Sequence, residues 1–136
     1  MAKITSMSSL SAGLVFREVL CKDDAVNVLT RGQVFPVLTS EANLPYVMYR
    51  RTSLDRQPTK TGVKGADTVR EEVHCYAETY AGSVELAEAV REALDCKQIV
   101  GRDGLVLRSC FLVGSQEDYD EQGGAYVQVL VFEARL

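Results

Sequence analysis

Apolar residues recur at helical spacing over residues 83–95, where Leu86, Val90 and Leu94 fall on one side and are expected in the core. Ser83 can accept hydrogen bonds from the first main-chain N–H groups, so it is expected to cap this helix. A second apolar stripe, which includes Leu14, predicts an earlier helix over residues 8–21, followed by a short helical turn. We therefore expect helices both before and after the first strands of the chain.

Four segments have patterns typical of β-strands: residues 44–51, 68–80, 105–113 and 125–135. In the second segment apolar and polar residues alternate, and Glu71, an exception on the apolar side, is expected near the solvent end. The last segment is apolar on nearly both faces, which is typical of a central strand or of a surface between subunits. The order α(α)-β-β-α-β-β predicts an α+β fold, in which an antiparallel sheet of about four strands carries helices on one face.

A long polar segment separates the first two of these strands. Residues 53–67 contain few apolar side chains and include Pro58, Gly62 and Gly65. Because such a segment buries little, its ordering entropy is poorly offset, and we expect a projecting or mobile loop. No repeat or linker divides the remaining chain, so residues 1–136 are expected to form a single domain.

Composition is that of a globular domain and excludes several classes of protein. Apolar residues make up 46% and charged residues 25% of the 136 residues, close to globular averages. The net charge of −4 leaves no excess of basic residues for duplex nucleic acid as the main ligand. No apolar run approaches the ~20 residues of a membrane helix, and the N-terminus lacks the apolar core of a secretory signal. The four cysteines are widely spaced, so free thiols in a reducing cytoplasm are expected.

No arrangement of residues points to catalysis or to a bound cofactor. His74 and Cys75 are neighbours on one predicted strand, so their side chains point to opposite faces and cannot form a thiol–imidazole pair. A turn is expected over residues 116–124, and its acidic residues 117–121 lack the spacing of a calcium loop. Glycine-rich phosphate motifs, GxSxG and HExxH are absent. We therefore expect no enzyme activity, no metal and no cofactor.

Two short segments hold opposite charges. Between positions 50 and 64, five basic residues against one acid give a net charge of +4: Arg50, Arg51, Arg56, Lys60 and Lys64. Between positions 115 and 122, four acids without a base give −4: Glu117, Asp118, Asp120 and Glu121. Each patch is either a solvated surface or, in a ring of identical subunits, a contact with the opposite patch of a neighbour. In the second case Leu130 and Phe132 are expected to supply apolar contact surface.

The order of several short motifs along nearly the whole chain resembles one known family. After the N-terminal helix, these motifs are residues 32–36 (GQVFP), 43–49 (NLPYVMY), 73–77 (VHCYA), 87–94 (AEAVREAL), 116–120 (QEDYD) and 124–132 (GAYVQVLVF). In this order they resemble the phage tail-completion family, also called tail terminator or head-to-tail joining proteins of long-tailed bacteriophages.

The resemblance implies a structural virion protein without enzyme activity. It implies a ring, hexameric in this family, that caps the head-proximal end of the tail tube and joins the tail to the head connector. The implied partners are other copies of the chain, the tail tube protein and a head connector or stopper protein. DNA passes through the ring only as cargo, and no membrane is involved. The implied location is the tail or neck of the virion, after synthesis in the bacterial host cytoplasm.

Two alternatives remain open at this point. One is a small cytoplasmic α+β domain that binds a ligand or has a regulatory role, which predicts a concave apolar pocket with a few converging polar groups. The other, within the same class of virion proteins, is a stopper or adaptor on the head side of the joint.

Overall fold

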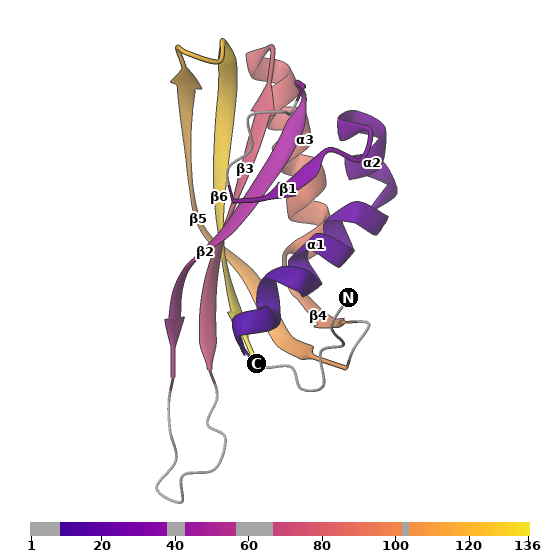
Figure 1. Ribbon diagram of the computed structural model, residues 1–136, viewed down its shortest axis with the longest axis vertical. Coiled ribbons are helices and arrows are strands. Elements are labelled where there is room, and N and C mark those ends of the chain that lie inside the picture. Colours follow the sequence, from indigo (N-terminus) through magenta and orange to yellow (C-terminus); the bar gives the residue numbers. More distant parts are fainter. Residues whose placement is uncertain (1–8, 38–42, 57–66, 102–103) are drawn as a thin grey trace, which may run out of the picture.

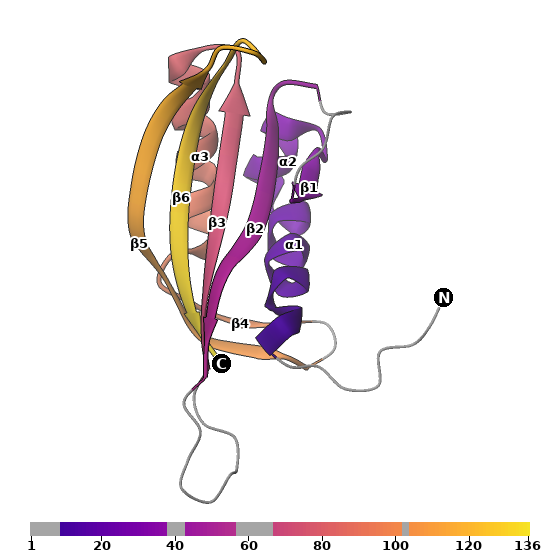
Figure 2. The ribbon, with the colours of Figure 1, turned by 60° about the vertical axis from the view of Figure 1, so that its left-hand side comes forward.

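A curled β-sheet with helices on one face makes up the computed structural model of the chain, which describes residues 9–37, 43–56, 67–101 and 104–136 (Figure 1). The helices of these residues are α1 (Ala12–Lys22), which follows a 3₁₀ turn at Ser9–Ser11, α2 (Asp24–Thr30) and α3 (Tyr80–Leu94). The strands are β1 (Val34–Pro36), β2 (Tyr46–Asp55), β3 (Thr68–Ala77), β4 (Lys97–Val100), β5 (Val106–Asp120) and β6 (Ala125–Arg135). Figure 2 shows that the long strands β2, β3, β6 and β5 run side by side, with α3 behind them.

The strands lie in the order β1-β2-β3-β6-β5-β4. β1 pairs with β2 in parallel, and every other neighbouring pair is antiparallel. The expected α+β class with helices on one face is confirmed, but the described residues form six strands instead of about four. The additional strands are β1 and β4 at the two borders, whose three and four residues are too few to show an alternating pattern.

Two of the long strands extend further than the sequence predicted. β5 continues to Asp120, whereas an end near residue 113 and an acidic turn over residues 116–124 were expected. Pairing with β6 continues to Asp120 opposite Ala125, and a strand that is polar on both faces shows no alternation of apolar residues. β2 continues to Asp55 in the same way. The expected loop over residues 53–67 therefore begins inside β2, and residues 57–66 lie outside the described part of the chain.

α1 and α3 form the hydrophobic core with the covered face of the sheet. Val90 and Leu94 of α3 are fully buried, as the sequence predicted. Phe16 of α1 meets Phe132 of β6 edge to face, with ring centroids 6.2 Å apart. Leu14, which was expected on the apolar side of the first helix, is instead 48% exposed. The helical stripe therefore identified the helix correctly but misplaced one border of its buried face.

α3 begins earlier than the sequence predicted, because a different residue caps it. The helix starts at Tyr80, and the Thr79 hydroxyl oxygen accepts the N–H of Gly82 at 3.0 Å. Ser83, the expected cap, lies one turn inside the helix and is fully buried. Its hydroxyl donates to the Tyr80 carbonyl at 2.7 Å and accepts from the Gln128 side chain at 3.3 Å. Ser83 thus ties α3 to β6.

Glu71 is a buried carboxylate in this core, which corrects the expected position near the solvent end of its strand. It lies on the covered face of β3 with 1% exposure, and its Oε2 has no hydrogen-bond partner among the described residues. Burial raises the pKa of Glu71 to about 7, and the charge of Arg51 opposes that rise only in part. Below about pH 7 the folded chain therefore favours the neutral carboxylic acid.

This pKa predicts that the protein loses stability as the pH rises from about 4.5 to 8. The folded-state pKa of Glu71 lies above its ordinary value of 4.5, so its contribution is complete at low pH and is lost as the pH passes 7. The loss is on the order of 3 kcal/mol. In the Glu71→Gln variant this part of the pH dependence should disappear in urea unfolding measured from pH 4.5 to 8. The exposed Glu85→Gln change serves as the control, and equal slopes for wild type and Glu71→Gln would contradict the assignment.

Candidate subunit and partner interface

β1 covers only the first part of the outer side of β2. Its three residues pair with Val47, Met48 and Tyr49, and no strand of the described chain lies beside β2 beyond them. We call residues 50–55 of β2 the β2 edge. Arg50 and Arg51 lie on this edge, both exposed. An open strand edge presents unpaired main-chain groups to which another strand can bond.

β4 covers only the beginning of β5, on the opposite border of the sheet. Its pairing reaches Cys110, and one step further the Asp95 carboxylate accepts the outward N–H of Leu112 at 2.8 Å. From residue 113 to residue 120 no described strand lies beside β5, and we call this segment the β5 edge. It carries Glu117, Asp118 and Asp120, and Glu121 follows in the turn to β6.

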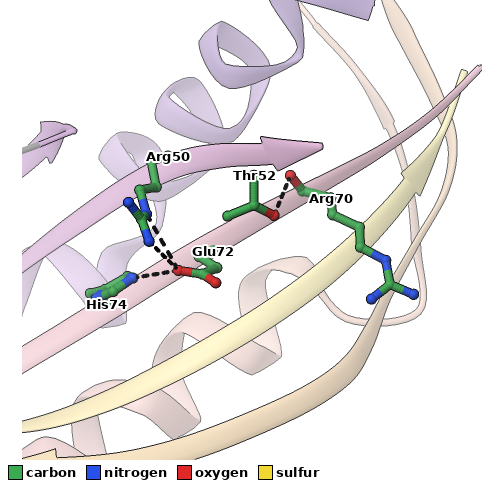
Figure 3. Close-up of polar contacts among 5 residues, drawn as sticks. All are labelled: Arg50, Thr52, Arg70, Glu72 and His74. Carbon is green, nitrogen blue, oxygen red and sulfur yellow. Dashed lines mark hydrogen bonds and ion pairs between the residues drawn. The ribbon is translucent and has the colours of Figure 1, made fainter. Parts of the chain in front are cut away.

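The basic side chains of the β2 edge are oriented by contacts within the chain. Arg50 donates to Glu72 Oε1 at 3.3 Å, and His74 Nε2 lies 2.9 Å from the same oxygen (Figure 3). Burial alone would raise the pKa of Glu72, but the hydrogen bonds from His74 and Arg50 outweigh it and lower that pKa. Arg51 donates to the main-chain carbonyl of Leu10 at 3.3 Å.

Glu117 is the one acid of the β5 edge that bonds to side chains of the covered face. It accepts from the Tyr80 hydroxyl at 2.9 Å and from the Gln128 amide at 3.0 Å, and these hydrogen bonds lower its pKa. Asp118 and Asp120 accept main-chain N–H groups next to them and form no ion pair within the described residues. The β5 edge therefore keeps charge that no described group of the same chain neutralises.

A hollow of about 490 Å³ lies on the helix-free face between β3 and β5. Val127 and Val129 of β6 line it together with Tyr76, Asp118 and Asp120. Burial, and to a smaller extent the charge of Asp120, raises the pKa of Tyr76. Tyrosines and carboxylates around this hollow favour a basic, hydrogen-bonding protein surface over an apolar small molecule.

The structure places the predicted interface residues in three groups. The residues Arg50, Arg51 and Arg56 lie on or directly after the β2 edge, and Glu117, Asp118, Asp120 and Glu121 lie on or directly after the β5 edge. Lys60 and Lys64 lie outside the described residues. Leu130 and Phe132 are 5% and 0% exposed, so the expectation that they form an apolar contact surface is wrong. β6 is apolar on both faces because it is a central strand, the other explanation its sequence allowed.

Exposed apolar side chains near the β5 edge were missed in the sequence. Phe111 and Val113 are 48% and 47% exposed at the point where the β5 edge begins. They continue the alternation of the strand predicted over residues 105–113, and alternation does not say which face of a strand is covered. These side chains add apolar surface beside the acidic segment.

His74 and Cys75 point to opposite faces, as predicted. Cys75 is fully buried on the covered face, where burial raises the pKa of its thiol above the ordinary value. The cysteines are free: Cys75 and Cys110 are buried, Cys21 is half-buried and Cys96 is exposed. Within the described residues no group of three or more histidine, cysteine, aspartate or glutamate side chains is arranged to hold a metal ion. None of the helices described is long and apolar enough to cross a membrane.

Oppositely charged strand edges on the two borders of a sheet favour contacts with other protein chains over a binding pocket for a small molecule. The family comparison agrees, because residues 16–136 match the model of the family "Tail completion protein gp17". This match covers most of the chain, so the chain belongs to that family and is a phage tail completion protein. It is a structural protein and not an enzyme, as the sequence predicted.

The fold is also found in a solved virion structure. A chain of the structure described as "Virion of native gene transfer agent (GTA) particle" is similar with a TM-score of 0.78 and 20% sequence identity. The similarity covers 94% of this chain and 98% of that chain, which supports one fold over the full length. No curated protein sequence matches the chain.

Proposed function

We propose that the chain forms a ring, hexameric as the family resemblance implies, that caps the head-proximal end of a phage tail tube and joins it to the head connector. The observation that carries this proposal is the position of the β2 and β5 edges. β3 and β6 lie between them, so the opposite charges of one chain cannot neutralise each other directly. Two copies can satisfy both edges only in a head-to-tail contact, and such a contact closes into a ring when its rotation allows.

The proposed location is the tail or neck of the virion, and the similar chain in the gene transfer agent particle supports it. The proposed partners are other copies of the chain, the tail tube protein and a head connector or stopper protein. DNA crosses the ring only as cargo, in agreement with the net charge of −4.

Negative-stain imaging of the purified chain, alone and with tail tubes, tests this proposal. We expect rings, and tubes that end in a ring at one end and no longer grow. A stopper or adaptor on the head side would instead bind the head connector and leave tube growth unchanged. A chain that remains monomeric in the presence of tubes and connectors, or that is missing from mature particles, would contradict the proposal.

Ring assembly should weaken as the salt concentration rises. Exposed ion pairs contribute only ~0–1 kcal/mol each, but several act at every contact, and salt screens charges beyond about 10 Å at 0.1 M. Between 50 mM and 500 mM NaCl we expect an increase of about tenfold or more in the protein concentration at half-assembly, measured by analytical ultracentrifugation. Urea unfolding of the monomer over the same range is the control, and assembly that does not respond to salt would show that the charged edges are merely solvated.

A further inference from the structure

The hollow on the helix-free face of the sheet has an apolar floor. Gln128 of β6 bonds to Ser83 of α3 and so points to the covered face, which puts its neighbours Val127 and Val129 on the opposite face. Both valines line the hollow and are only 7% and 6% exposed, although no helix of the described chain covers this side. The floor therefore offers apolar contact to a side chain that enters from outside.

Tyr76 forms the wall of the hollow on the β3 side. Its ring stacks on that of Tyr46 of β2, with centroids 4.6 Å apart and planes inclined by 15°. Because β2 and β6 lie on opposite sides of β3, the other face of the Tyr76 ring is turned toward β6 and the hollow. The face of an aromatic ring carries partial negative charge and attracts a cation.

Asp118 and Asp120 form the wall on the β5 side. Asp118 is directly opposite Val127, and Asp120 lies two residues further on the same face of the strand. Burial raises the pKa of Tyr76 and the charge of Asp120 raises it further, so this carboxylate lies near the aromatic wall. Each carboxylate accepts one main-chain N–H of its own chain, which leaves acceptor capacity for a cation.

The floor and the two walls together fit a lysine or arginine side chain. The aliphatic stem of such a side chain can lie on the valines while its charged head contacts the tyrosine ring and the carboxylates. A small apolar ligand would leave both carboxylates without a partner. The hollow therefore suits a basic segment of a protein.

The chain contains a basic segment, but this segment follows β2 at the other end of the sheet. Residues 56–64 hold Arg56, Lys60 and Lys64 and no acid, a net charge of +3. Figure 1 shows the turn between β5 and β6 at one end of the molecule and the end of β2 at the other. Asp55 is level with Arg135 of β6, and the eight residues from Arg135 to Val127 span about 26 Å.

The basic side chains of a chain cannot reach the hollow of the same chain. Lys60 follows Arg56 by four residues, which span at most about 14 Å, and its side chain adds roughly 6 Å. Arg56 itself lies one residue further from the hollow than Asp55, so Lys60 falls short by roughly 10 Å. Lys64 precedes Asp67 by three residues and reaches less far. The hollow is therefore open to a segment of another molecule.

We propose that the hollow holds the basic segment, residues 56–64, of the next copy in the ring, with Lys60 between the Tyr76 ring and the carboxylates of Asp118 and Asp120. A second copy is the occupant because every copy carries both the hollow and the segment of opposite charge. Lys60 is the basic residue of this segment farthest from the strands on either side. The inference rests on the ring proposed above and adds the site at which neighbouring copies bind.

This contact sets a condition on the arrangement of the ring. The neighbouring copy has to be displaced along its strands by roughly 10 Å or more, the distance by which Lys60 falls short within one chain. Copies in a ring are related by rotation, so strands inclined to the ring axis produce such a displacement. The contact needs no strand pairing between copies, and β1 keeps its place beside Val47, Met48 and Tyr49.

Cross-linking of the wild-type ring without a spacer tests the occupant. A carbodiimide joins a lysine amine to a carboxylate as an amide, with loss of water, when the two groups are in contact. In rings assembled from isotope-labelled and unlabelled chains, we expect mass spectrometry to show Lys60 joined to Asp118 or Asp120 in products that mix the two labels. Lys22, which pairs with Glu18 of its own chain at 3.0 Å, is the internal control and should give unmixed products.

Variants of the two stacked tyrosines test the aromatic wall. Tyr76→Leu removes the ring that lines the hollow, and Tyr46→Leu removes its stacking partner outside the hollow. Both changes lose the stack, so urea unfolding of the two monomers measures that common effect. We expect Tyr76→Leu to raise the protein concentration at half-assembly at least about fivefold, whereas Tyr46→Leu and Tyr76→Phe should stay within about twofold of the wild type.

The outcomes separate this inference from the proposed function. Rings in which neither Lys60 nor Lys64 is linked to residues 116–122 of another copy, or in which Tyr76→Leu assembles as well as Tyr46→Leu, would overturn this contact and leave the ring proposal standing. Links within one chain, or links from the hollow to a different protein in capped tails, would also overturn it. Wild-type protein that neither forms rings nor caps tubes would overturn both proposals.

Discussion

Reversal of the acidic charge on the β5 edge, by Asp118→Lys and Asp120→Lys, is expected to abolish ring assembly while the monomer remains folded. Neither carboxylate takes part in an ion pair within the described chain, so the change removes no such pair from the fold. In the proposed contact it places lysines beside arginines of the neighbouring copy, and like charges in a contact cost several kcal/mol. Sedimentation velocity should show monomer at concentrations where the wild type is assembled.

A second pair of changes makes this prediction specific. Arg50→Glu and Arg56→Glu alone should also block assembly, and in combination with Asp118→Lys and Asp120→Lys they should restore part of it. Glu85→Lys with Glu92→Lys on the exposed side of α3 alters the net charge equally and should leave assembly intact. If the combined variant recovers nothing while the α3 control assembles, the two patches do not contact each other.

Leu94→Ala is expected to lower the free energy of unfolding by about 2–5 kcal/mol. The side chain of Leu94 is fully buried, with 0% exposure. It lies in the hydrophobic core with Leu86, Val90 and Phe132. Truncation loses the transfer free energy of the removed methyl groups and leaves a cavity that the surrounding side chains fill only in part. Urea unfolding followed by circular dichroism measures the change.

Leu14→Ala provides a matched control in the other long helix. Leu14 is 48% exposed on α1, so the same chemical change removes fewer contacts and should cost below about 1 kcal/mol. A change within about 0.5 kcal/mol for Leu94→Ala would mean that α3 does not pack on the sheet through this face.

The long elements of the fold follow from local patterns along the chain. The helix expected over residues 83–95 is α3, and the strand expected over residues 68–80 is β3 with its alternation nearly intact. Residues on one face recur about every 3.6 positions in a helix and every 2 positions in a strand. Because one face of each element is buried, its apolar residues recur in the sequence with the same period. The charged patches and the order of motifs typical of the tail-completion family were also evident from the residues alone.

The parts that local patterns could not predict depend on partners distant in the sequence. β1 and β4 are strands only because β2 and β5 lie beside them, and the polar end of β5 is a strand because β6 pairs with it. Whether an acidic segment is a turn or a strand is decided by main-chain hydrogen bonds, which leave no trace in the order of side chains.

Local patterns and long-range packing also determine different things about which side chains are buried. The sequence by itself determined the α+β class, the helices, the four long strands and the two opposite charges, because periodicity and charge are properties of neighbouring residues. Only the tertiary structure decided that Glu71 lies in the core, that Phe132 is hidden and that the charges lie on open strand edges. Those features depend on which elements cover a given face or border, and that is a consequence of long-range packing.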